Sequence, residues 1–266
     1  SQEVINAIEK ISNSSIRWIK GDIKDKCILQ KIFRDNTIES VIHFAGLKSL
    51  PKSFEYPIDY YLNNVNGTIN LINEMNRANI KKIIFSSSAT VYGDSHTLPW
   101  NENLDLKIPK SPYAQSKFII ENFLRNIFIN DHEWSVGILR YFNPIGAHSS
   151  GLLGEDISND NTNLFPAILN VYLKNKTHLD VYGNDFNTCD GSGIRDYIHI
   201  DDLVDGHLKA MEFIDIHNGY NIWNLGSGKG YSVFQVLKEF EKASETKIPY
   251  KIRNRRKGDI GEYWAD

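Results

Sequence analysis

Cysteine and methionine are scarce in this chain, with two of each among 266 residues. Two cysteines, Cys27 and Cys189, cannot supply the disulfide framework that holds a small secreted domain together. Nothing around them has the Cys and His spacing of a zinc site, so we expect no metal ligands. The sequence therefore favours a protein of the reducing cytoplasm that folds around an apolar core.

Long apolar runs and charge of one sign are lacking as well. No stretch approaches the roughly 20 apolar residues of a membrane-spanning helix. The 30 basic residues nearly balance the 33 acidic ones, which leaves a net charge of −3. This balance argues against binding of nucleic acid or of a membrane surface. The one basic cluster, residues 253–257, is either a solvated turn or a local phosphate site.

What the chain does contain is an alternation of short β-branched runs with longer amphipathic segments. The apolar runs predict strands at residues 16–19, 40–44, 82–86 and 135–140. The amphipathic spacing predicts helices near 25–35, 58–78 and 112–130. This order is typical of an α/β protein with a Rossmann-like, doubly wound parallel sheet.

The texture of the sequence changes near residue 143. Loops rich in Gly, Asn and Asp follow, then a helix near 164–174 and a strand at 179–182. We therefore expect a first domain, residues 1–143, and a smaller α/β lobe, residues 144–266, partly interleaved with the first. The chain starts on helix-like sequence without a methionine, so we also expect residues to be missing at both ends.

Small or polar residues follow each expected strand of the first domain. They are found at residues 21–23, 45–48, 87–90 and 141–143. In an open parallel sheet, ligands bind beyond the carboxyl ends of the strands, where small residues let a backbone approach the ligand. This edge of the sheet is therefore the predicted site.

Tyr113 and Lys117 stand four residues apart at the start of an expected helix, which places them on one face. A free Tyr ionises near pH ~10, and a neighbouring ammonium group favours the phenolate, so Tyr113 would become a usable base. Tyr172 and Lys176 repeat the same spacing, so the pair alone is close to chance. Ser88, just after the third expected strand, adds a hydroxyl that can relay a proton and makes the pattern more specific.

Several longer blocks then carry a resemblance. The residues 41–48, 63–68, 85–93, 111–113, 139–144 and 193–199 resemble the UDP-glucose (UDP-galactose) 4-epimerases of the extended short-chain dehydrogenase/reductase family. The likeness runs from about Gly21 to Asp266. It implies interconversion of UDP-glucose and UDP-galactose with a tightly held NAD. Tyr113 would take the proton of the sugar 4-hydroxyl while hydride passes from C4 to the nicotinamide, and hydride would return to the other face of the 4-keto sugar.

The resemblance also implies the residues of the site. Ser88, Tyr113 and Lys117 would be catalytic. The cofactor would be bound by Asp22, Ile23, Phe44, Ala45, Gly46, Leu47, Lys48, Asn63, Ser88, Tyr113, Lys117 and Phe142. The UDP-sugar would be bound by Ser88, Tyr113, Asn143, Asn163, Leu164, Asp180, Val181, Tyr182, Arg195, Arg256, Asp259 and Tyr263. Arg195 and Arg256 suit a pyrophosphate, since a planar guanidinium can donate two parallel hydrogen bonds.

Two finer expectations follow from the same resemblance. The family position of Tyr263 lies beside the sugar 2-substituent, so a bulky Tyr predicts preference for UDP-glucose and UDP-galactose over N-acetylated UDP-sugars. A homodimer is implied, and the apolar stripe of Phe118, Ile119, Phe123, Ile127 and Phe128 is broader than one core face needs. A helix covered on all sides by its own fold is the alternative explanation of the stripe.

Two other functions compete with epimerisation. A 4,6-dehydratase or a decarboxylase of the same family needs further acid–base groups, and residues 88–92 contain no Asp or Glu. A non-catalytic nucleotide-binding module of this fold has no need for Ser88, Tyr113 and Lys117 together. Both comparisons favour the epimerase.

The chain departs from the family in one respect. The family begins with a strand and a Gly-x-x-Gly-x-x-Gly turn that binds the pyrophosphate at a helix N-terminus, and these 266 residues contain no such turn. Residues 226–230 read Gly-Ser-Gly-Lys-Gly, but they fit neither this motif nor a P-loop. We interpret them as a tight turn, with Ser232 capping the helix that follows.

If Ser1 were the native start, we expect binding of NAD to be badly impaired, because the pyrophosphate would lose its backbone donors. Absorbance of the purified chain measures its bound NAD. One equivalent of NAD per chain would contradict this expectation.

Overall fold

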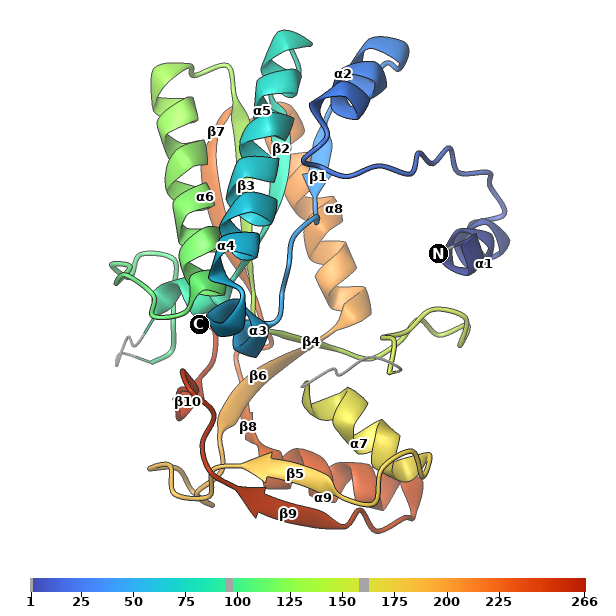
Figure 1. Cartoon of the computed structure of the whole chain (residues 1–266), viewed down its shortest axis with the longest axis vertical. Coiled ribbons are helices and arrows are strands. Elements are labelled where there is room, and N and C mark those ends of the chain that lie inside the picture. Colours follow the sequence, from blue (N-terminus) through green and yellow to red (C-terminus); the bar gives the residue numbers. More distant parts are fainter. Residues whose placement is uncertain (1, 94–97, 158–162) are drawn as a thin grey trace. The chain divides into compact units, whose positions relative to one another are not determined.

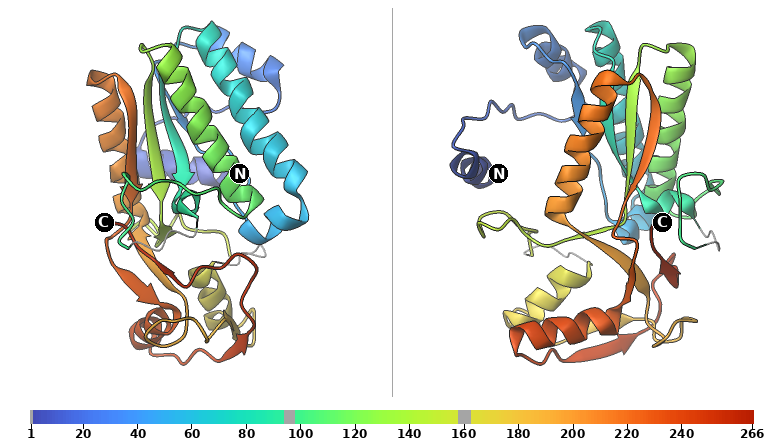
Figure 2. Two further views of the ribbon diagram at one scale, coloured as in Figure 1. Left: turned by 90° about the vertical axis from the view of Figure 1, so that its left-hand side faces the viewer. Right: turned by 180° about the vertical axis from the view of Figure 1, so that it is seen from behind.

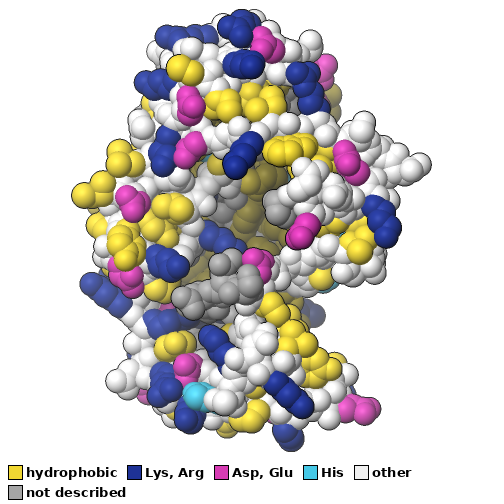
Figure 3. All heavy atoms as spheres, turned by 45° about the vertical axis from the view of Figure 1, so that its right-hand side comes forward, with side chains coloured by type: hydrophobic (Ala, Val, Ile, Leu, Met, Phe, Trp, Pro, Cys, Tyr) yellow, Lys and Arg dark blue, Asp and Glu magenta, His cyan; other side chains and the backbone are white. Residues whose placement is uncertain are grey.

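The computed structural model describes residues 2–93, 98–157 and 163–266. Its internal contacts divide the chain into two compact units, each assembled from separate segments. The first unit comprises residues 1–19, 143–203 and 226–264, and the second comprises residues 20–142, 204–225 and 265–266. On the face drawn in Figure 3, Lys and Arg side chains are interspersed with Asp and Glu, in keeping with the small net charge.

The second unit is built on a four-stranded parallel sheet (Figure 1). Its strands are β1 (Val41–His43), β2 (Lys82–Ser88), β3 (Ser135–Tyr141) and β7 (Gly219–Leu225), in that order across the sheet. All neighbouring pairs are parallel. The expected strands at 40–44, 82–86 and 135–140 are thereby confirmed, and the predicted Rossmann-like sheet is observed.

Helices cover both faces of this sheet, as Figure 2 shows. α2 (Lys26–Asp35), α5 (Gly67–Arg77) and α6 (Pro112–Asn130) share a core with one face, which includes Leu29, Met75, Ile83, Leu124 and Ile138. α8 (Ile200–Ile216) packs Ala210 and Ile214 against Ile84 and Leu139 on the other face. Burial on both faces explains why these strands are apolar along almost their whole length.

The helix expected near 58–78 is interrupted. α3 (Leu50–Glu55) and α4 (Pro57–Tyr60) precede a π-helical stretch, η1 (Tyr61–Asn66), before α5 begins at Gly67. A π-helical stretch has an extra residue in its turn and frequently occurs at functional sites. Apolar periodicity does not reveal it, since the polar run Asn63–Asn64 lies between apolar positions on either side.

α6 begins at a well-defined cap. The Ser111 hydroxyl accepts a hydrogen bond from the Ala114 amide, and Pro112 occupies the first helical position, where no amide donor is needed. Tyr113 therefore lies in the first turn of α6 and Lys117 in the second. At the end of β2, the 3₁₀ turn η2 (Ala89–Tyr92) begins, with Ser88 as its cap.

The first unit contains α1 (Gln2–Ser12), α7 (Leu164–Tyr172) and α9 (Val233–Ser244) with two small sheets. One sheet has the order β10 (Glu262–Tyr263), β6 (Ile194–His199) and β4 (Asn143–Ile145), and β8 (Gly230–Ser232) pairs antiparallel with β6. In the other, β5 (Leu179–Tyr182) pairs with β9 (Tyr250–Arg253). The expected helix near 164–174 and strand at 179–182 are confirmed as α7 and β5.

The strand expected at residues 16–19 is wrong. This segment has no strand geometry, and Trp18 and Ile19 are each 48% exposed. A strand exists only through hydrogen bonds to a neighbouring strand, so a β-branched run without such a partner stays irregular.

The turn at 226–230 and its cap behave as the sequence predicts. The buried Asp196 carboxylate accepts hydrogen bonds from the amides of Ser227 (2.7 Å) and Gly228 (3.0 Å), and Gly228 has a φ of +75° that favours glycine. Ser232 then caps α9 in a capping box with Gln235.

Candidate active site

The three residues predicted to be catalytic come from β2 and α6, which pack against each other. Ser88 ends β2, and the register of the sheet pairs it with Tyr141 of β3. Tyr141 interacts electrostatically with Tyr113 of α6, and the Lys117 ammonium donates to the Ser86 carbonyl of β2 at 2.6 Å. Each of the three therefore lies at the carboxyl end of β2.

Lys117 is buried, with 6% of its surface exposed. Besides the Ser86 carbonyl, its ammonium contacts the face of the Phe85 ring, 4.7 Å from the centroid. Burial lowers the pKa of Lys117 to about 8, against an opposing effect of the Glu121 carboxylate. The group can therefore carry a positive charge at neutral pH and still lose it within an accessible pH range.

Tyr113 is half-buried and lies edge-on to Tyr60 of α4, with ring centroids 6.4 Å apart. Its phenol thus has a defined wall on one side and remains partly open to a ligand. The second Tyr-x-x-x-Lys pair is different: α7 ends at Tyr172, and Lys176 follows in an exposed turn. Only the first pair combines helical spacing with burial of its lysine.

The loop after β1 is held in place by Asn64 of η1. The Asn64 side chain accepts from the Leu47 amide at 2.7 Å and donates to the Leu47 carbonyl at 3.1 Å and to Ser116 Oγ of α6 at 3.0 Å. These bonds fix the loop 44–48 beside Lys117, while residues 44–48 themselves stay exposed. Asn63, the predicted cofactor ligand, is half-buried and donates to Asn64 Oδ1 at 3.0 Å.

A dinucleotide fits the residues around this loop. A Cβ added at Gly46 would lie 3.3 Å from Asn64 Oδ1, which is tight, and 3.7 Å from Lys117 Nζ, so the backbone at Gly46 passes close to Lys117. An ammonium has three donors, of which the Ser86 carbonyl takes one. Lys117, Asn63 and the exposed backbone of 44–48 therefore suit the nicotinamide half of a dinucleotide.

The other predicted cofactor residues belong to the same unit. Phe142 is buried and its ring centroid lies 6.3 Å from that of Trp100. Asp22 is exposed, and Ile23 packs beside Gly67 of α5. The close approach of Ile23 explains the glycine, since a Cβ at position 67 would lie 2.7 Å from Ile23 Cγ2.

In the first unit, the structure brings three of the predicted sugar ligands together. The Tyr263 hydroxyl donates to Asn143 Oδ1 at 3.2 Å, and the Arg195 guanidinium lies over the Tyr263 ring, 4.5 Å from its centroid. Arg195 also donates to the Ile194 carbonyl at 2.8 Å. The Tyr263 ring is thus held between an amide and a guanidinium.

A second group forms around Arg256. Its guanidinium donates to the Asp259 carboxylate at 2.9 Å and lies over the Tyr182 ring, 4.9 Å from the centroid. Tyr197 of β6 connects the two groups. Burial raises the pKa of Tyr197 to about 12, and the positive charges of Arg195 and Arg256 both oppose that rise.

The remaining predicted sugar ligands are more dispersed. Asp180 forms an ion pair with Arg253 at 2.7 Å, and Val181 is buried in the core of the first unit, so only its backbone could meet a ligand. Asn163 precedes α7 and donates to Glu155 at 3.1 Å, and Leu164 starts that helix.

The basic run 253–257 is largely compensated. Arg253, Arg255 and Arg256 each pair with an aspartate, at 2.7, 2.7 and 2.9 Å. Only Arg256 combines such a pair with a half-buried site beside other predicted ligands. Within the run 253–257, Arg256 is therefore the residue that remains a candidate for binding a phosphate.

Sequence reasoning missed several polar residues that hold the predicted ones. Asn64 and Tyr197 are two of them, and the buried trio Ser87, Glu121 and Arg140 behind Lys117 is a third case. The sequence does contain a signal for Glu121 and Arg140. Each is a charged residue inside an otherwise apolar helix stripe or strand, and such a residue is seldom buried unless it is paired.

Among the described residues, no helix has the length and apolarity needed to cross a membrane.

Comparison with known proteins gives a consistent result. The family model described as "NAD dependent epimerase/dehydratase family" matches residues 2–226. A UDP-glucose 4-epimerase of Pasteurella multocida is 46% identical over 266 residues, which are 100% of this chain and 79% of that protein. A UDP-glucose 4-epimerase of Yersinia enterocolitica is 48% identical over 265 residues, 100% of this chain and 78% of that protein.

A solved structure is similar throughout. The crystal structure of UDP-glucose 4-epimerase from Bifidobacterium longum, in complex with NAD+ and UDP, superimposes with a TM-score of 0.97. It is 44% identical and is matched over 100% of this chain and 79% of its own length. With this likeness in fold and sequence, and with a matched family model over most of its length, the chain belongs to the NAD dependent epimerase/dehydratase family.

Proposed function

We propose that this protein interconverts UDP-glucose and UDP-galactose by NAD-dependent epimerisation at C4 of the sugar, as an isomerase. The observation that carries the proposal is the buried Lys117 ammonium, one helical turn after Tyr113 and bonded to the strand that ends at Ser88. Its relatives are named UDP-glucose 4-epimerases, and one was crystallised with NAD+ and UDP. The assay is formation of UDP-glucose from UDP-galactose with NAD supplied.

In this proposal, residues of α6 and β2 transfer one proton from and to the sugar. Tyr113 takes the proton from the sugar 4-hydroxyl and later gives it back. The Lys117 cation stabilises the phenolate that Tyr113 needs for this step. Ser88 donates to the same sugar oxygen and keeps it aligned with Tyr113. Its own hydroxyl accepts from the Thr90 hydroxyl at 3.0 Å, which leaves the Ser88 proton for the sugar.

NAD, when bound, would accept hydride from C4 and return it to the opposite face of the sugar. The second unit would hold it through Asn63, Lys117, Phe142 and loop 44–48, with Asp22 and Ile23 at the adenine. Net redox change is zero, so the protein has only to retain both partners between the two transfers. Loop 44–48, fixed by Asn64, supports such retention.

We propose that the first unit binds the UDP-sugar. Arg195 and Arg256 would bind the pyrophosphate, and Tyr197 and Asp259 would orient them. Asn143 and Tyr263 would contact the sugar, while Asn163, Leu164, Asp180, Val181 and Tyr182 would line the nucleoside end. The turn 88–92 carries no Asp or Glu, which supports epimerisation over 4,6-dehydration or decarboxylation. The two free, exposed cysteines support a reducing cytoplasm.

We also propose a homodimer formed through α4, η1, α5 and α6. Ile58, Leu62, Ile69 and Ile119 on these elements are between 39% and 71% exposed. Apolar side chains exposed along adjoining elements mark a protein interface more often than a free surface, and closed two-fold dimers are the commonest assembly.

Tyr113→Phe should lower kcat for UDP-galactose by about 10²- to 10⁴-fold, because the phenylalanine ring cannot accept the 4-hydroxyl proton. Circular dichroism should show an unchanged fold. Tyr172→Phe is the matched control, since it removes the hydroxyl of the second Tyr-x-x-x-Lys pair, and it should keep the parental rate. Equal rates in the parent and Tyr113→Phe would leave the fold as a nucleotide-binding module without this chemistry.

Tyr263→Ala should raise turnover of UDP-N-acetylglucosamine relative to UDP-glucose by about tenfold or more, because the ring no longer occupies space for a 2-substituent. The ratio of kcat/KM for the two substrates measures this. Tyr250→Ala removes an exposed tyrosine from β9 of the same unit and serves as control. A parental protein that already turns over both substrates equally contradicts the argument.

Leu62→Lys should convert a dimer into a monomer, because the interface cannot accommodate an unpaired ammonium. Sedimentation velocity at micromolar concentration distinguishes the two states. Ile252→Lys places the same charge on exposed β9 and should leave the dimer intact. A parental chain that sediments as a monomer overturns the proposed dimer.

A further inference from the structure

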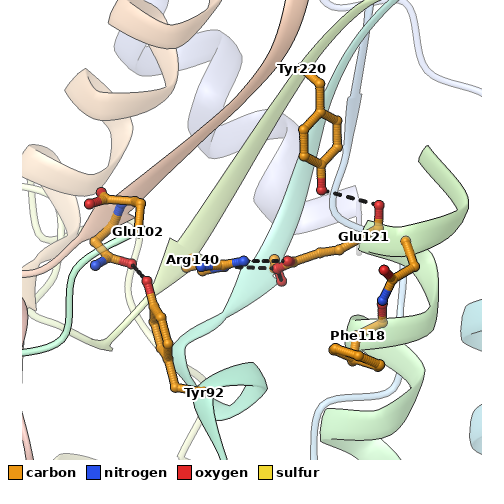
Figure 4. Close-up of polar contacts among 9 residues, drawn as sticks. Tyr92, Glu102, Phe118, Glu121, Arg140 and Tyr220 are labelled. Atoms are coloured by element: carbon orange, nitrogen blue, oxygen red, sulfur yellow. Dashed lines mark hydrogen bonds and ion pairs between the residues drawn. The ribbon is translucent and has the colours of Figure 1, made fainter. Parts of the chain in front are cut away.

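A buried ion pair lies behind Lys117. The Glu121 carboxylate accepts from Arg140 Nε at 3.1 Å and from Arg140 Nη2 at 2.7 Å, and both side chains are almost completely buried. Figure 4 shows the two side chains pointing toward each other, Arg140 from β3 and Glu121 from α6. Ser87 of β2 donates to the same carboxylate at 2.5 Å. Burying a bidentate ion pair of this kind costs desolvation energy, so the pair contributes little net stability to the fold.

The position of the pair suggests what it does. Tyr113, Lys117 and Glu121 follow one another at intervals of four residues, so they form a single stripe along α6. The sheet register pairs Ser87 directly with Arg140, which turns both toward the Glu121 end of that stripe. The three charges thus stand in the order ammonium, carboxylate, guanidinium.

Four other titratable groups come from the elements packed on this region, namely His43 of β1, Tyr92 of η2, Tyr141 of β3 and Tyr220 of β7. The charged Lys48 of loop 44–48 and Arg125 of α6 are exposed, so solvent screens them. Burial lowers the pKa of His43 to about 3, with a further contribution from Lys117, so the imidazole is neutral. Burial raises the pKa of all three tyrosines, so they are neutral too. The buried charge that acts on Lys117 is therefore Glu121, and Arg140 is hydrogen-bonded to Glu121 in turn.

We propose that Glu121 and Arg140 are positioning residues of the reaction centre: the Glu121 carboxylate keeps Lys117 a cation one helical turn from Tyr113, and Arg140 and Ser87 fix that carboxylate. The role for catalysis rests on the proposed epimerase function. The charge relation among the three side chains does not, because it belongs to the fold itself.

Opposite effects of the two single variants are the expected signature. Glu121→Gln leaves Arg140 as an uncompensated buried cation, so Lys117 should lose its proton at a lower pH. Arg140→Gln leaves the Glu121 carboxylate uncompensated, so Lys117 should keep its proton to a higher pH. Each shift should be about one pH unit, as expected when a neighbouring buried charge is changed. A purely structural pair would weaken both variants and move neither midpoint.

The measurement uses the chain without added cofactor. Lysine labelled with ¹³C at Cε gives one NMR signal per lysine, and Lys117→Arg identifies the signal of Lys117. The parental midpoint should be near 8. Tyr220→Phe is the control, because the Tyr220 hydroxyl donates to the Glu121 backbone carbonyl at 3.1 Å and not to the carboxylate. Its midpoint should match the parent.

A double variant keeps the test decisive if a single one fails to fold. Glu121→Gln with Arg140→Gln removes the pair as a whole, which proteins tolerate far better than an unpaired buried charge. Because the Glu121 carboxylate is the charge that raises the pKa of Lys117, the midpoint should still fall, by less than in Glu121→Gln. An unchanged midpoint in the double variant, or shifts of one sign in both singles, overturns the proposal.

The rate profile separates this inference from the proposed function. With NAD and UDP-galactose, the alkaline limb of kcat should move with the NMR midpoint in each variant. A chain whose Lys117 midpoints split as expected, but which forms no UDP-glucose, contradicts the epimerase function and supports the charge relation. Active variants whose alkaline limbs coincide contradict the positioning role.

Discussion

A buried ammonium group is the constraint on which this structure depends. An ion taken out of water loses several kcal/mol of hydration, and the fold has to replace it with fixed dipoles and charges. Lys117 receives the Ser86 carbonyl at 2.6 Å, the Phe85 ring face at 4.7 Å and the field of Glu121. Of these three groups only Glu121 belongs to α6, whereas Ser86 and Phe85 belong to β2. The helix can therefore carry this lysine only when it is docked on β2.

The sheet has to be in one register for that docking to work. From β2, the Ser86 carbonyl and the Ser88 side chain serve the reaction centre. Arg140 of β3 has to lie opposite Ser87 to reach Glu121. A slip of β3 by one residue would turn Arg140 to the face covered by α8, and the Glu121 carboxylate would lose its two hydrogen bonds from the guanidinium. The polar residues at this edge thus specify the same alignment that the apolar core of Ile83, Val136 and Ile138 stabilises.

The sequence was sufficient for the elements whose signal is local. Apolar runs identified β1, β2 and β3, the short segment 179–182 identified β5, and amphipathic spacing with the Ser111–Pro112 start identified α6. The run 16–19 carried the same signal, but a strand also needs a hydrogen-bonding neighbour, which no local pattern reports. The π-helical stretch at 61–66 was not predicted for a related reason. The role of Asn64 depends on hydrogen bonds to Leu47 and Ser116, which are distant in the chain. The catalytic stripe was predictable to Lys117, whereas Glu121 and its partner 19 residues away needed the register of the sheet.

The arrangement of charges also bears on why this lysine works beside a tyrosine. An isolated buried lysine would discharge to the neutral amine, which cannot stabilise a phenolate. A lysine paired directly with a carboxylate would keep its charge, but the pair would be neutral as seen from Tyr113. In this chain the guanidinium of Arg140 takes up the Glu121 carboxylate through two hydrogen bonds. Three charges then sum to one positive charge, and the member of the trio that lies on the Tyr113 side is the ammonium. Burying three charges instead of a balanced pair costs stability. The remaining positive charge is what produces a net electrostatic field at the Tyr113 phenol.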